Sequence, residues 1–427
     1  GEGIGKVDGY TLFVKDGVIG DEVTVKVMKA NKNFGFARLM EIKKPSKDRV
    51  TPRCSVARQC GGCQIQCLSY EEQLKFKQNK VYNNLVRIGG QDDFIMKDII
   101  GMEEPFNYRN KAQFPVGLDK QGNVVSGFYA GRTHSIIGID SCDLGLKLDG
   151  RDINKEVMDI VKKFMTKYQI EPYNEVTHKG LVRHVLIRIG AKTKQIMVCT
   201  IINGRKLPNK DELVEKLCKL EGMQSVSLNV NTNKSNVILG NKIINLYGPG
   251  YIEDYIGDVK FRISPLSFFQ VNPVQTEKLY NKALEYADLS GNEIVWDLYC
   301  GIGSISLFLA KKAKKVLGVE IVPEAIEDAK LNAKINNINN AEFFVGAAED
   351  VVAEYFSKHE NEAECKPDVI VVDPPRKGCD EKLLSTIVKM NPKRVVYVSC
   401  DSATLARDVK WLSENGYKLK EATPCDM

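Results

Sequence analysis

The chain has 427 residues, of which 43% are hydrophobic and 27% charged, as in a folded protein of two or three domains. Its formal net charge of +6 is only mildly basic and does not by itself mark a nucleic-acid-binding protein. Hydrophobic runs are far shorter than a membrane span, and no secretory signal pattern opens the chain. We therefore expect a cytoplasmic protein that is not embedded in a membrane.

The first part of the chain predicts short strands at residues 10–14, 22–28 and 34–40, separated by Gly and Asp turns. Such strands favour a small antiparallel barrel of the oligonucleotide-binding (OB) type. Residues 31–60 then carry eight Lys or Arg side chains against two carboxylates. A basic face attracts a polyanion through counterion release, but a solvated lysine-rich surface explains the charge alone equally well.

Clustered cysteines follow the basic stretch. Cys54, Cys60 and Cys63 lie within ten residues, with two glycines between the last two and Cys67 close behind. A Cys-x2-Cys pair is half of a zinc site, but the chain has no second pair of this kind. Three clustered cysteines plus a distant one are typical of an iron–sulfur site. Cys142, between turn-like residues, is the best fourth candidate, and zinc remains the alternative metal.

Further along, a helix is predicted at residues 70–88, followed by a mixed region and then by a regular alternation of strands and helices. The mixed region has predicted strands at 111–116, 181–189, 195–201, 225–230 and 260–263, and helices at 153–168 and 210–220. The alternating region has predicted strands at 294–298, 315–319, 342–345, 369–372 and 394–399, and helices at 273–287, 303–313, 323–336, 383–390 and 404–415. This alternation predicts a parallel α/β sheet of the Rossmann type, and we place domains at 1–45, 46–265 and 266–427.

A glycine-rich loop ends the first strand of the predicted parallel sheet. Gly301 and Gly303 allow a tight turn and a close approach to a ligand, whereas Ser306 stands where a dinucleotide fingerprint has its third glycine. Glu320, at the end of the next strand, can accept hydrogen bonds from both ribose hydroxyls of an adenosine. Asp297 at the head of the loop favours S-adenosylmethionine, which carries an ammonium and no pyrophosphate, over NAD. The alternative is a tight turn in an unrelated α/β protein.

Two later strands end in residues that can take part in catalysis. Asp373-Pro374-Pro375-Arg376 is a stiff loop whose Asp373 is placed to face the reacting end of the cofactor. Cys400 follows a β-branched run at residues 395–399. Carbon 5 of a pyrimidine is a poor nucleophile until a thiolate adds to carbon 6, and Cys400 is placed for that role. The alternative is a core cysteine that closes a strand.

Four motifs together resemble one enzyme family, the iron–sulfur RNA (uracil-5-)-methyltransferases that act on 23S ribosomal RNA. They are the segment from Ser399 to Asp408, Asp373-Pro374-Pro375-Arg376, the segment from Ser267 to Asn272, and the cysteines at 54, 60 and 63. The resemblance covers essentially the whole chain. It implies a Rossmann-like methyltransferase domain, an N-terminal TRAM-type barrel and a mixed central domain that carries a four-iron four-sulfur cluster.

The same resemblance implies residue roles. Cys400 is the implied nucleophile, and the implied cofactor contacts are Gln270, Tyr299, Glu320 and Asp373. The implied cluster ligands are Cys54, Cys60, Cys63 and Cys142, with the cluster bracing the RNA-binding domain. Phe268 resembles the aromatic side chain that lines the pocket for a flipped-out base. Lys111 (after Asn110), and Arg132 and His134 within residues 131–134, are weaker RNA-contact candidates, and packing or surface roles are the alternatives for Phe268 and His134.

The chain also departs from the family. At Ser304 some relatives carry Asn, and the family's proton-abstracting Glu lies in a segment after Asp-Met, whereas this sequence stops at Met427. We therefore expect the chain as given to bind cofactor and RNA but to turn over poorly. The competing hypotheses are a transfer RNA uridine methyltransferase, an inactive RNA-binding relative and, remotely, an NAD oxidoreductase. We expect a monomer without an obligate protein partner.

Overall fold

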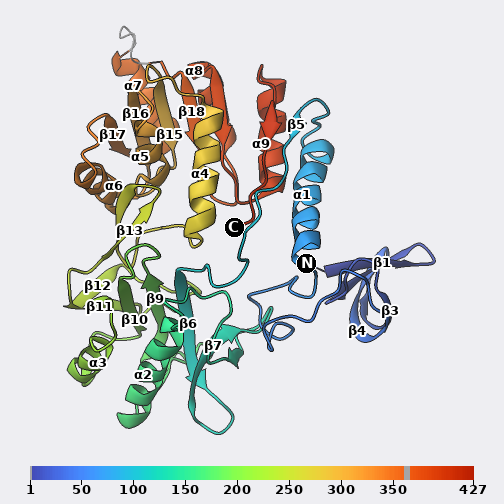
Figure 1. Ribbon diagram of the computed structural model, residues 1–427, viewed down its shortest axis with the longest axis vertical. Helices are drawn as coiled ribbons and strands as arrows, with labels where there is room; N and C mark the ends of the chain where they lie inside the picture. Colours follow the sequence, from blue (N-terminus) through green and yellow to red (C-terminus); the bar gives the residue numbers. More distant parts are fainter. Residues whose placement is uncertain (1, 360–365) are drawn as a thin grey trace.

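The computed structural model describes residues 2–359 and 366–427, whose strands form three sheets of four or more strands. Figure 1 shows a parallel sheet at one end of an elongated molecule, a seven-stranded sheet at the other end, and a small N-terminal sheet at the side. A long helix, α1 (Tyr70–Arg87), runs from the N-terminal sheet toward the parallel sheet.

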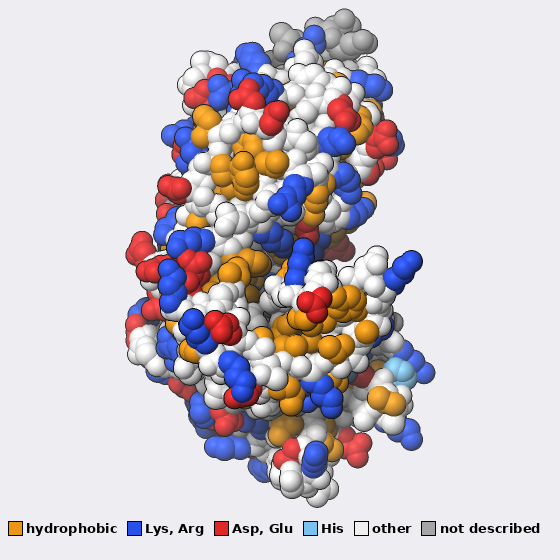
Figure 2. Space-filling model, turned by 90° about the vertical axis from the view of Figure 1, so that its right-hand side faces the viewer, with side chains coloured by type: hydrophobic (Ala, Val, Ile, Leu, Met, Phe, Trp, Pro, Cys, Tyr) orange, Lys and Arg blue, Asp and Glu red, His pale blue; other side chains and the backbone are white. Residues whose placement is uncertain are grey.

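The N-terminal sheet contains the three strands that the sequence predicted and one more. Its strands, in the order β1-β2-β4-β3, are β1 (Glu2–Val7), β2 (Tyr10–Lys15), β3 (Glu22–Ala30) and β4 (Phe34–Lys44). Alternation along each strand places Leu12, Val14, Ala37 and Leu39 in a small core. The intervening aromatic residues lie on the opposite face, which adjoins the hydrophobic patch turned toward the viewer in Figure 2.

The seven-stranded sheet of the middle region has the order β12-β11-β10-β9-β6-β7-β8. Its strands are β6 (Lys111–Leu118), β7 (Val124–Tyr129), β8 (Ile136–Gly138), β9 (Val182–Ile189), β10 (Ile196–Ile202), β11 (Met223–Val230) and β12 (Lys242–Tyr247). Helices α2 (Ile153–Lys167) and α3 (Lys210–Leu217) pack their buried residues on one face. The sequence did not predict β7, β8 or β12, which are half-exposed and lie toward the sheet edges.

A two-stranded hairpin connects the two larger sheets. It consists of β13 (Ile252–Ile256) and β14 (Val259–Ile263), and leads into α4 (Pro273–Ala287). Asn272 caps α4 by accepting a hydrogen bond from the backbone N of Gln275 at 3.2 Å, and Pro273 opens the first turn, as the sequence predicted. A second small pairing joins β5 (Ile95–Met96) to β20 (Glu421–Ala422), which brings residues before and after the central region together.

All five strands of the parallel sheet point the same way, in the order β17-β16-β15-β18-β19. They are β15 (Ile294–Leu298), β16 (Lys315–Glu320), β17 (Ala341–Val345), β18 (Val369–Val372) and β19 (Arg394–Tyr397). The helices are α5 (Ser304–Ala310), α6 (Pro323–Ile335), α7 (Ala348–His359), α8 (Glu381–Met390) and α9 (Ser402–Glu414). The Rossmann-like expectation is confirmed.

Both faces of this sheet are covered, which explains why its strands are almost continuously apolar. Val295 on β15 packs with α4, α5 and α6, whereas the next residue, Trp296, packs with α7, α8 and α9. Several boundaries differ from the prediction: β19 ends at Tyr397 and not at 399, α3 at Leu217 and not at 220, α5 at Ala310 and not at 313, and β4 at Lys44 and not at 40. Helix α7 was not predicted. None of the described helices is both long enough and apolar enough to cross a membrane.

Candidate active site

The predicted chemical residues of the parallel sheet meet at one edge. Because the strands are parallel, their carboxyl ends lie together, and ligands of open α/β sheets bind there. Tyr299 follows β15, Glu320 ends β16, Asp373 follows β18 and Cys400 lies shortly after β19. Cys400 is exposed, which disagrees with the alternative of a core cysteine that closes a strand.

Two carboxylates at this edge have raised pKa values. Asp297 is completely buried, and burial raises its pKa to about 7, with the charges of Asp373 and Glu320 adding to the rise. Its only hydrogen-bond donor among the described side chains is the hydroxyl of Ser306, and its Oδ1 has no partner. Burial also raises the pKa of Asp373, to about 6. Asp297 and Asp373 therefore form an acidic cluster at this edge, and a bound cation would stabilise their ionised forms.

The glycine-rich loop has backbone angles that bring it against β16. Gly301 and Gly303 have φ values of 56° and 81°, and Tyr299 also has a positive φ of 71°. A Cβ on Gly303 would lie 3.2 Å from side-chain atoms of Ala329 and Phe343. The backbone N of Gly301 donates to Glu320 Oε2 at 3.2 Å, so the loop and the carboxylate fix each other.

A buried tyrosine that the sequence did not single out joins the cofactor loop to the preceding segment. Tyr280, on α4, hydrogen bonds through its hydroxyl to Ser304 Oγ at 2.9 Å. Burial, followed by the charge of Asp373, raises the pKa of Tyr280, and Gln270 forms a hydrogen bond to the same hydroxyl. Gln270, Tyr280, Ser304 and Asp373 are thus neighbours. In the sequence, the only signal for Tyr280 is its place as an aromatic residue on the apolar face of a predicted helix. A residue that only packs in the core gives the same pattern.

Helix α9 anchors the loop that carries Cys400 to the loop that carries Asp373. The N-cap residue Asp401, directly after Cys400, accepts from the backbone N of Ala403 at 2.9 Å. Further along α9, Asp408 is buried and accepts from the backbone N of Cys379 at 2.8 Å and from the hydroxyl of Tyr397 at 2.7 Å. The position of the thiol relative to the Asp373 loop is therefore set by α9.

Other α9 side chains reinforce this anchor. Thr404 Oγ1 donates to the carbonyl of Arg376 at 3.1 Å, and Arg407 donates to the carbonyls of Lys377 and Cys379 at 2.9 and 3.1 Å. Gly378 has a φ of 77°, and a Cβ there would lie 2.5 Å from Asp408 Oδ2. Only glycine fits this close approach without displacing the carboxylate.

Cys54, Cys60, Cys63 and Cys142 are neighbours, whereas Cys67 has other neighbours. Burial raises the pKa of Cys63, and the thiols of Cys60 and Cys54 add to the rise. Burial also raises the pKa of Cys142, with contributions from Cys63 and Cys54. Cys67 instead interacts with Arg49 and two aspartates. Over the described residues, no group of three or more His, Cys, Asp or Glu side chains is arranged to hold a metal ion.

The candidate RNA-contact residues lie in separate places. Phe268 precedes α4 and is 70% exposed, which suits an aromatic side chain with a binding role. Lys111 begins β6 and is partly buried. Arg132 is exposed and pairs with Glu2 on β1 at 3.3 Å, while His134 pairs with Glu175. Arg132 thus contacts the N-terminal sheet, whereas His134 contacts the middle region.

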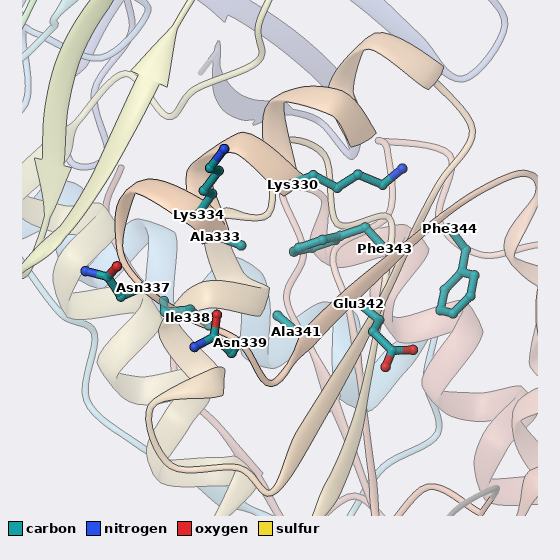
Figure 3. Close-up of a pocket in the computed structure, with 10 residues that line it drawn as sticks. All are labelled: Lys330, Ala333, Lys334, Asn337, Ile338, Asn339, Ala341, Glu342, Phe343 and Phe344. Atoms are coloured by element: carbon teal, nitrogen blue, oxygen red, sulfur yellow. The ribbon is translucent and has the colours of Figure 1, made fainter.

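A separate pocket of about 640 Å³ opens between α6 and β17. Figure 3 shows Lys330 and Lys334 on α6 beside Phe343 on β17, with Phe344 directed to the other side. None of the residues predicted to bind a cofactor or to carry chemistry lines this pocket. The carboxyl edge of the sheet remains the candidate active site.

The comparisons with known proteins agree with this geometry. Residues 147–424 match the family described as tRNA (Uracil-5-)-methyltransferase. The chain belongs to this uracil-5-methyltransferase family. Residues 1–40 match the TRAM domain. An "Uncharacterized RNA methyltransferase" of Clostridium tetani is 51% identical over 100% of this chain and 90% of its own length, and a Bacillus cereus protein of the same description is 51% identical over 100% and 91%.

A solved relative extends the likeness to three dimensions. The tRNA (uracil-54, C5)-methyltransferase of Pyrococcus abyssi, solved in complex with S-adenosyl-L-homocysteine, has a TM-score of 0.74 and 29% sequence identity. The match covers 96% of this chain and 90% of that one. The family resemblance is thus confirmed, and this member of the uracil-5-methyltransferase family is an RNA methyltransferase.

We predict that Asp408→Asn lowers the free energy of unfolding by about 2 kcal/mol, because a buried carboxylate with charge-assisted hydrogen bonds becomes an amide facing Arg407. Urea denaturation measures the change. The matched control is Asp350→Asn, which breaks an exposed pair with Lys382 and should change stability by less than about 0.5 kcal/mol. Equal effects of the two substitutions would contradict the anchoring role of Asp408.

Proposed function

We propose that the chain transfers a methyl group from S-adenosylmethionine to carbon 5 of a uridine in 23S ribosomal RNA through a covalent adduct of Cys400. One observation carries this proposal: an exposed thiol lies at the same sheet edge as the buried acidic cluster. The cluster attracts a cationic cofactor, and the thiol supplies the nucleophile that uracil requires. Family membership restricts the reaction class to uracil-5 methylation.

The cofactor roles follow from the charges at this edge. S-adenosylmethionine carries an ammonium and a sulfonium, and Asp297 and Asp373 supply negative charge in a buried setting. Glu320 keeps a free lone pair on each carboxylate oxygen after accepting from Gly301 and Val322, and these lone pairs suit the ribose hydroxyls. Gln270, near the Tyr280 hydroxyl, and Tyr299, directly after β15, are the further proposed contacts, while the backbone of Gly301 and Gly303 allows the loop to approach the ligand.

The reaction on uracil proceeds in three steps. The Cys400 thiolate adds to carbon 6, and the electron pair of the 5,6 double bond becomes an enolate. Carbon 5 then attacks the cofactor's methyl group, and the sulfonium leaves as a neutral thioether. Loss of the carbon 5 proton to a base restores the double bond and expels the thiolate. The anchor from α9 to the Asp373 loop keeps the thiol and the methyl donor in register during these steps.

Two surfaces suit an RNA substrate. Phe268 is exposed near Gln270 and can stack on a base taken out of the RNA fold. The N-terminal sheet presents three contacting aromatic rings, Phe13, Phe34 and Phe36, with centroids 5.6 to 5.8 Å apart. Aromatic rings beside a basic segment bind single-stranded nucleic acid by stacking and charge. Arg132, which contacts Glu2 of the N-terminal sheet, and Lys111, whose neighbour Asn110 contacts Val271, add positive charge.

Transfer RNA is the second candidate substrate. The cysteine group and the TRAM domain favour ribosomal RNA, because the resemblance that carries both is to enzymes of 23S ribosomal RNA. The similarity to the Pyrococcus abyssi tRNA (uracil-54, C5)-methyltransferase favours transfer RNA. That match covers 96% of this chain, so it extends into the TRAM domain, and this domain alone does not decide between the two RNAs.

We further propose that Cys54, Cys60, Cys63 and Cys142 hold a four-iron four-sulfur cluster. Cys54 and Cys60 raise the pKa of Cys63, and Cys63 and Cys54 raise that of Cys142, which supports a common site, whereas the separate neighbours of Cys67 exclude that residue. A cubane cluster is larger than one ion, so its thiolates lie farther apart than the ligands of a single metal. When bound, the cluster would brace the loop through four Fe–S bonds. The methyl transfer needs no electron from it.

We predict that the protein forms a covalent complex with 5-fluorouridine-containing 23S ribosomal RNA in the presence of S-adenosylmethionine, because fluorine at carbon 5 blocks release of the adduct. Denaturing gel electrophoresis detects the complex, and Cys400→Ala abolishes it. Cys425→Ala is the matched control and should leave it intact. A complex with transfer RNA only would favour the second candidate, and no complex with either RNA would refute the proposed mechanism.

We predict that S-adenosylmethionine binds more tightly as pH rises from about 5 to about 8. Burial raises the pKa of Asp373 to about 6 and of Asp297 to about 7, and the cationic cofactor favours their ionised forms. Binding therefore releases protons, with a gain in affinity on the order of tenfold. Isothermal titration calorimetry in buffers of different ionisation enthalpy measures both quantities. Asp373→Asn should flatten the pH dependence, and a flat profile in the unaltered protein would contradict it.

We predict how the stability of the cofactor-free protein depends on pH from the pKa values of the same two carboxylates. Their folded pKa values exceed the ordinary value of 3.8, so the folded state binds more protons than the unfolded state between about pH 4 and pH 7. Their contribution to stability is therefore greatest at low pH and declines through this window. Cofactor binding should reverse this decline in stability with rising pH. Calorimetry of the protein with and without cofactor detects the difference.

We predict that protein purified without oxygen contains about four iron and four sulfide per chain. Iron analysis and electron paramagnetic resonance after reduction measure the cluster. Cys63→Ala and Cys142→Ala should lose it, whereas Cys67→Ala, the matched control from the same loop, should keep it. Stoichiometric zinc, or loss of iron in Cys67→Ala, would refute the assignment of the four ligands.

A further inference from the structure

Two buried cations lie side by side where the seven-stranded sheet meets the parallel sheet. Lys111 on β6 and Arg188 on β9 are direct partners in the antiparallel pairing of these strands. Arg188 is only 3% exposed, and Lys111 is partly buried. Arg188 lies in β9, all of whose residues are buried, where a charged side chain is unusual unless it has a partner.

Neither cation has an anionic partner among the described residues. Arg188 donates to the backbone carbonyl of Ser267, and its Nε has no hydrogen-bond partner. Burial lowers the pKa of Lys111 to about 8, and the two charges that add to this effect, Arg188 and Arg109, are both positive. Burial likewise lowers the pKa of Arg188 to about 10. The site therefore holds excess positive charge in a poorly solvated place.

Other enclosed arginines of the chain have more partners, although among the described residues Arg183 also lacks an anionic partner and its Nε has no hydrogen bond. Arg49 pairs with the carboxylate of Asp21. Arg183, which is as buried as Arg188, donates to the carbonyls of Asn231, Asn233 and Ser235 and lies over the ring of Tyr173. A buried charge without a partner is strongly unfavourable. The pair at 111 and 188 is thus short of an anion that another molecule can supply.

The location of the pair indicates which molecule supplies the anion. Arg188 contacts the carbonyl of Ser267, the residue directly before the exposed Phe268. Asn110, next to Lys111, donates from its backbone N to the carbonyl of Val271 at 3.0 Å and from its side chain to the carbonyl of Gln270 at 3.1 Å. The cations therefore adjoin the segment that carries both the proposed base-stacking ring and a proposed cofactor contact.

We propose that Lys111 and Arg188 form a phosphate site that binds the RNA backbone next to the target uridine. This inference rests on the proposed function and extends it to a specific contact. Taking a base out of the stack rotates its backbone, and a cation beside the base pocket can hold the phosphate in the rotated position. Lys111, the more exposed of the two, contacts the phosphate. Arg188 is a positioning residue that fixes the Ser267 carbonyl and contributes charge.

The test combines stability and RNA binding in Lys111→Met. Fluorescence anisotropy with a labelled uridine decanucleotide, over a series of salt concentrations, measures affinity and its salt dependence. We expect binding to weaken about tenfold and the slope of log K against log salt to fall by about 0.7, the value for one phosphate of a single strand. In the RNA-free protein, the substitution should leave the unfolding temperature unchanged or raise it, because an unpaired buried charge is removed.

The controls separate a phosphate site from a structural role. Lys111→Arg should retain the affinity and the slope, and Lys120→Met, in the exposed turn after β6, should alter neither. Affinity for S-adenosylmethionine should not change in any of these variants. A lower unfolding temperature of Lys111→Met together with an unchanged salt slope would overturn the proposal, because it would show that Lys111 serves folding alone.

The outcome is also distinguishable from failure of the proposed reaction. Binding of the decanucleotide does not require Cys400, so the salt slope can fall in Lys111→Met even if no covalent complex forms with 5-fluorouridine RNA. Conversely, a covalent complex that forms equally in Lys111→Met, with unchanged affinity, would leave the reaction intact and remove the phosphate site. Inorganic phosphate that competes with the decanucleotide equally well in the unaltered protein and in Lys111→Met would also overturn the assignment.

Discussion

The arrangement of the active site depends on one electrostatic constraint, the burial of Asp297 and Asp373 at the carboxyl edge of a parallel sheet. Both carboxylates have raised pKa values because they are removed from water, and Asp297 keeps an oxygen without a hydrogen-bond partner. Such groups are unfavourable in the empty protein and favourable when a cation is bound. The tight turn at Gly301, the carboxylate of Glu320 and the hydroxyl of Tyr280 all surround this acidic cluster. The site therefore gives up some stability in exchange for affinity toward a cationic cofactor.

A second constraint places Cys400, the proposed nucleophile. Cys400 lies on an exposed loop, but that loop continues into α9, and the buried carboxylate of Asp408 joins α9 to the loop after Asp373. Helix α1 adds a contact from the opposite end of the chain, because Asn84 donates to Ser402 Oγ at 2.8 Å. Helix α1, which follows the loop that carries Cys54, Cys60 and Cys63, thus packs against α9, which follows Cys400. The phosphate site proposed at Lys111 and Arg188 follows the same logic as the acidic cluster, with the sign of the charge reversed.

The sequence predicted the parallel sheet well, since its strands are apolar on both faces and alternate with amphipathic helices. It also predicted the positions of Asp297, Glu320, Asp373 and Cys400 at or near strand ends, because a parallel sheet gathers those ends at one edge. It did not predict β7, β8 or β12, whose side chains face solvent for much of their length and lack a clear alternation. The roles of Tyr280, Asp408 and Arg188 depend on contacts between residues far apart in the chain, which no local pattern records.

The central claim is that the acidic cluster holds the cofactor with its sulfur directed at Cys400. A crystal structure of the chain with S-adenosylhomocysteine tests this claim most directly. The account predicts the ribose hydroxyls on Glu320, the amino acid end beside Asp297 and Gly301, and the sulfur on the side of Asp373 that faces the Cys400 thiol. Cofactor bound in the pocket between α6 and β17, or at the sheet edge with its sulfur turned away from Cys400, would contradict it.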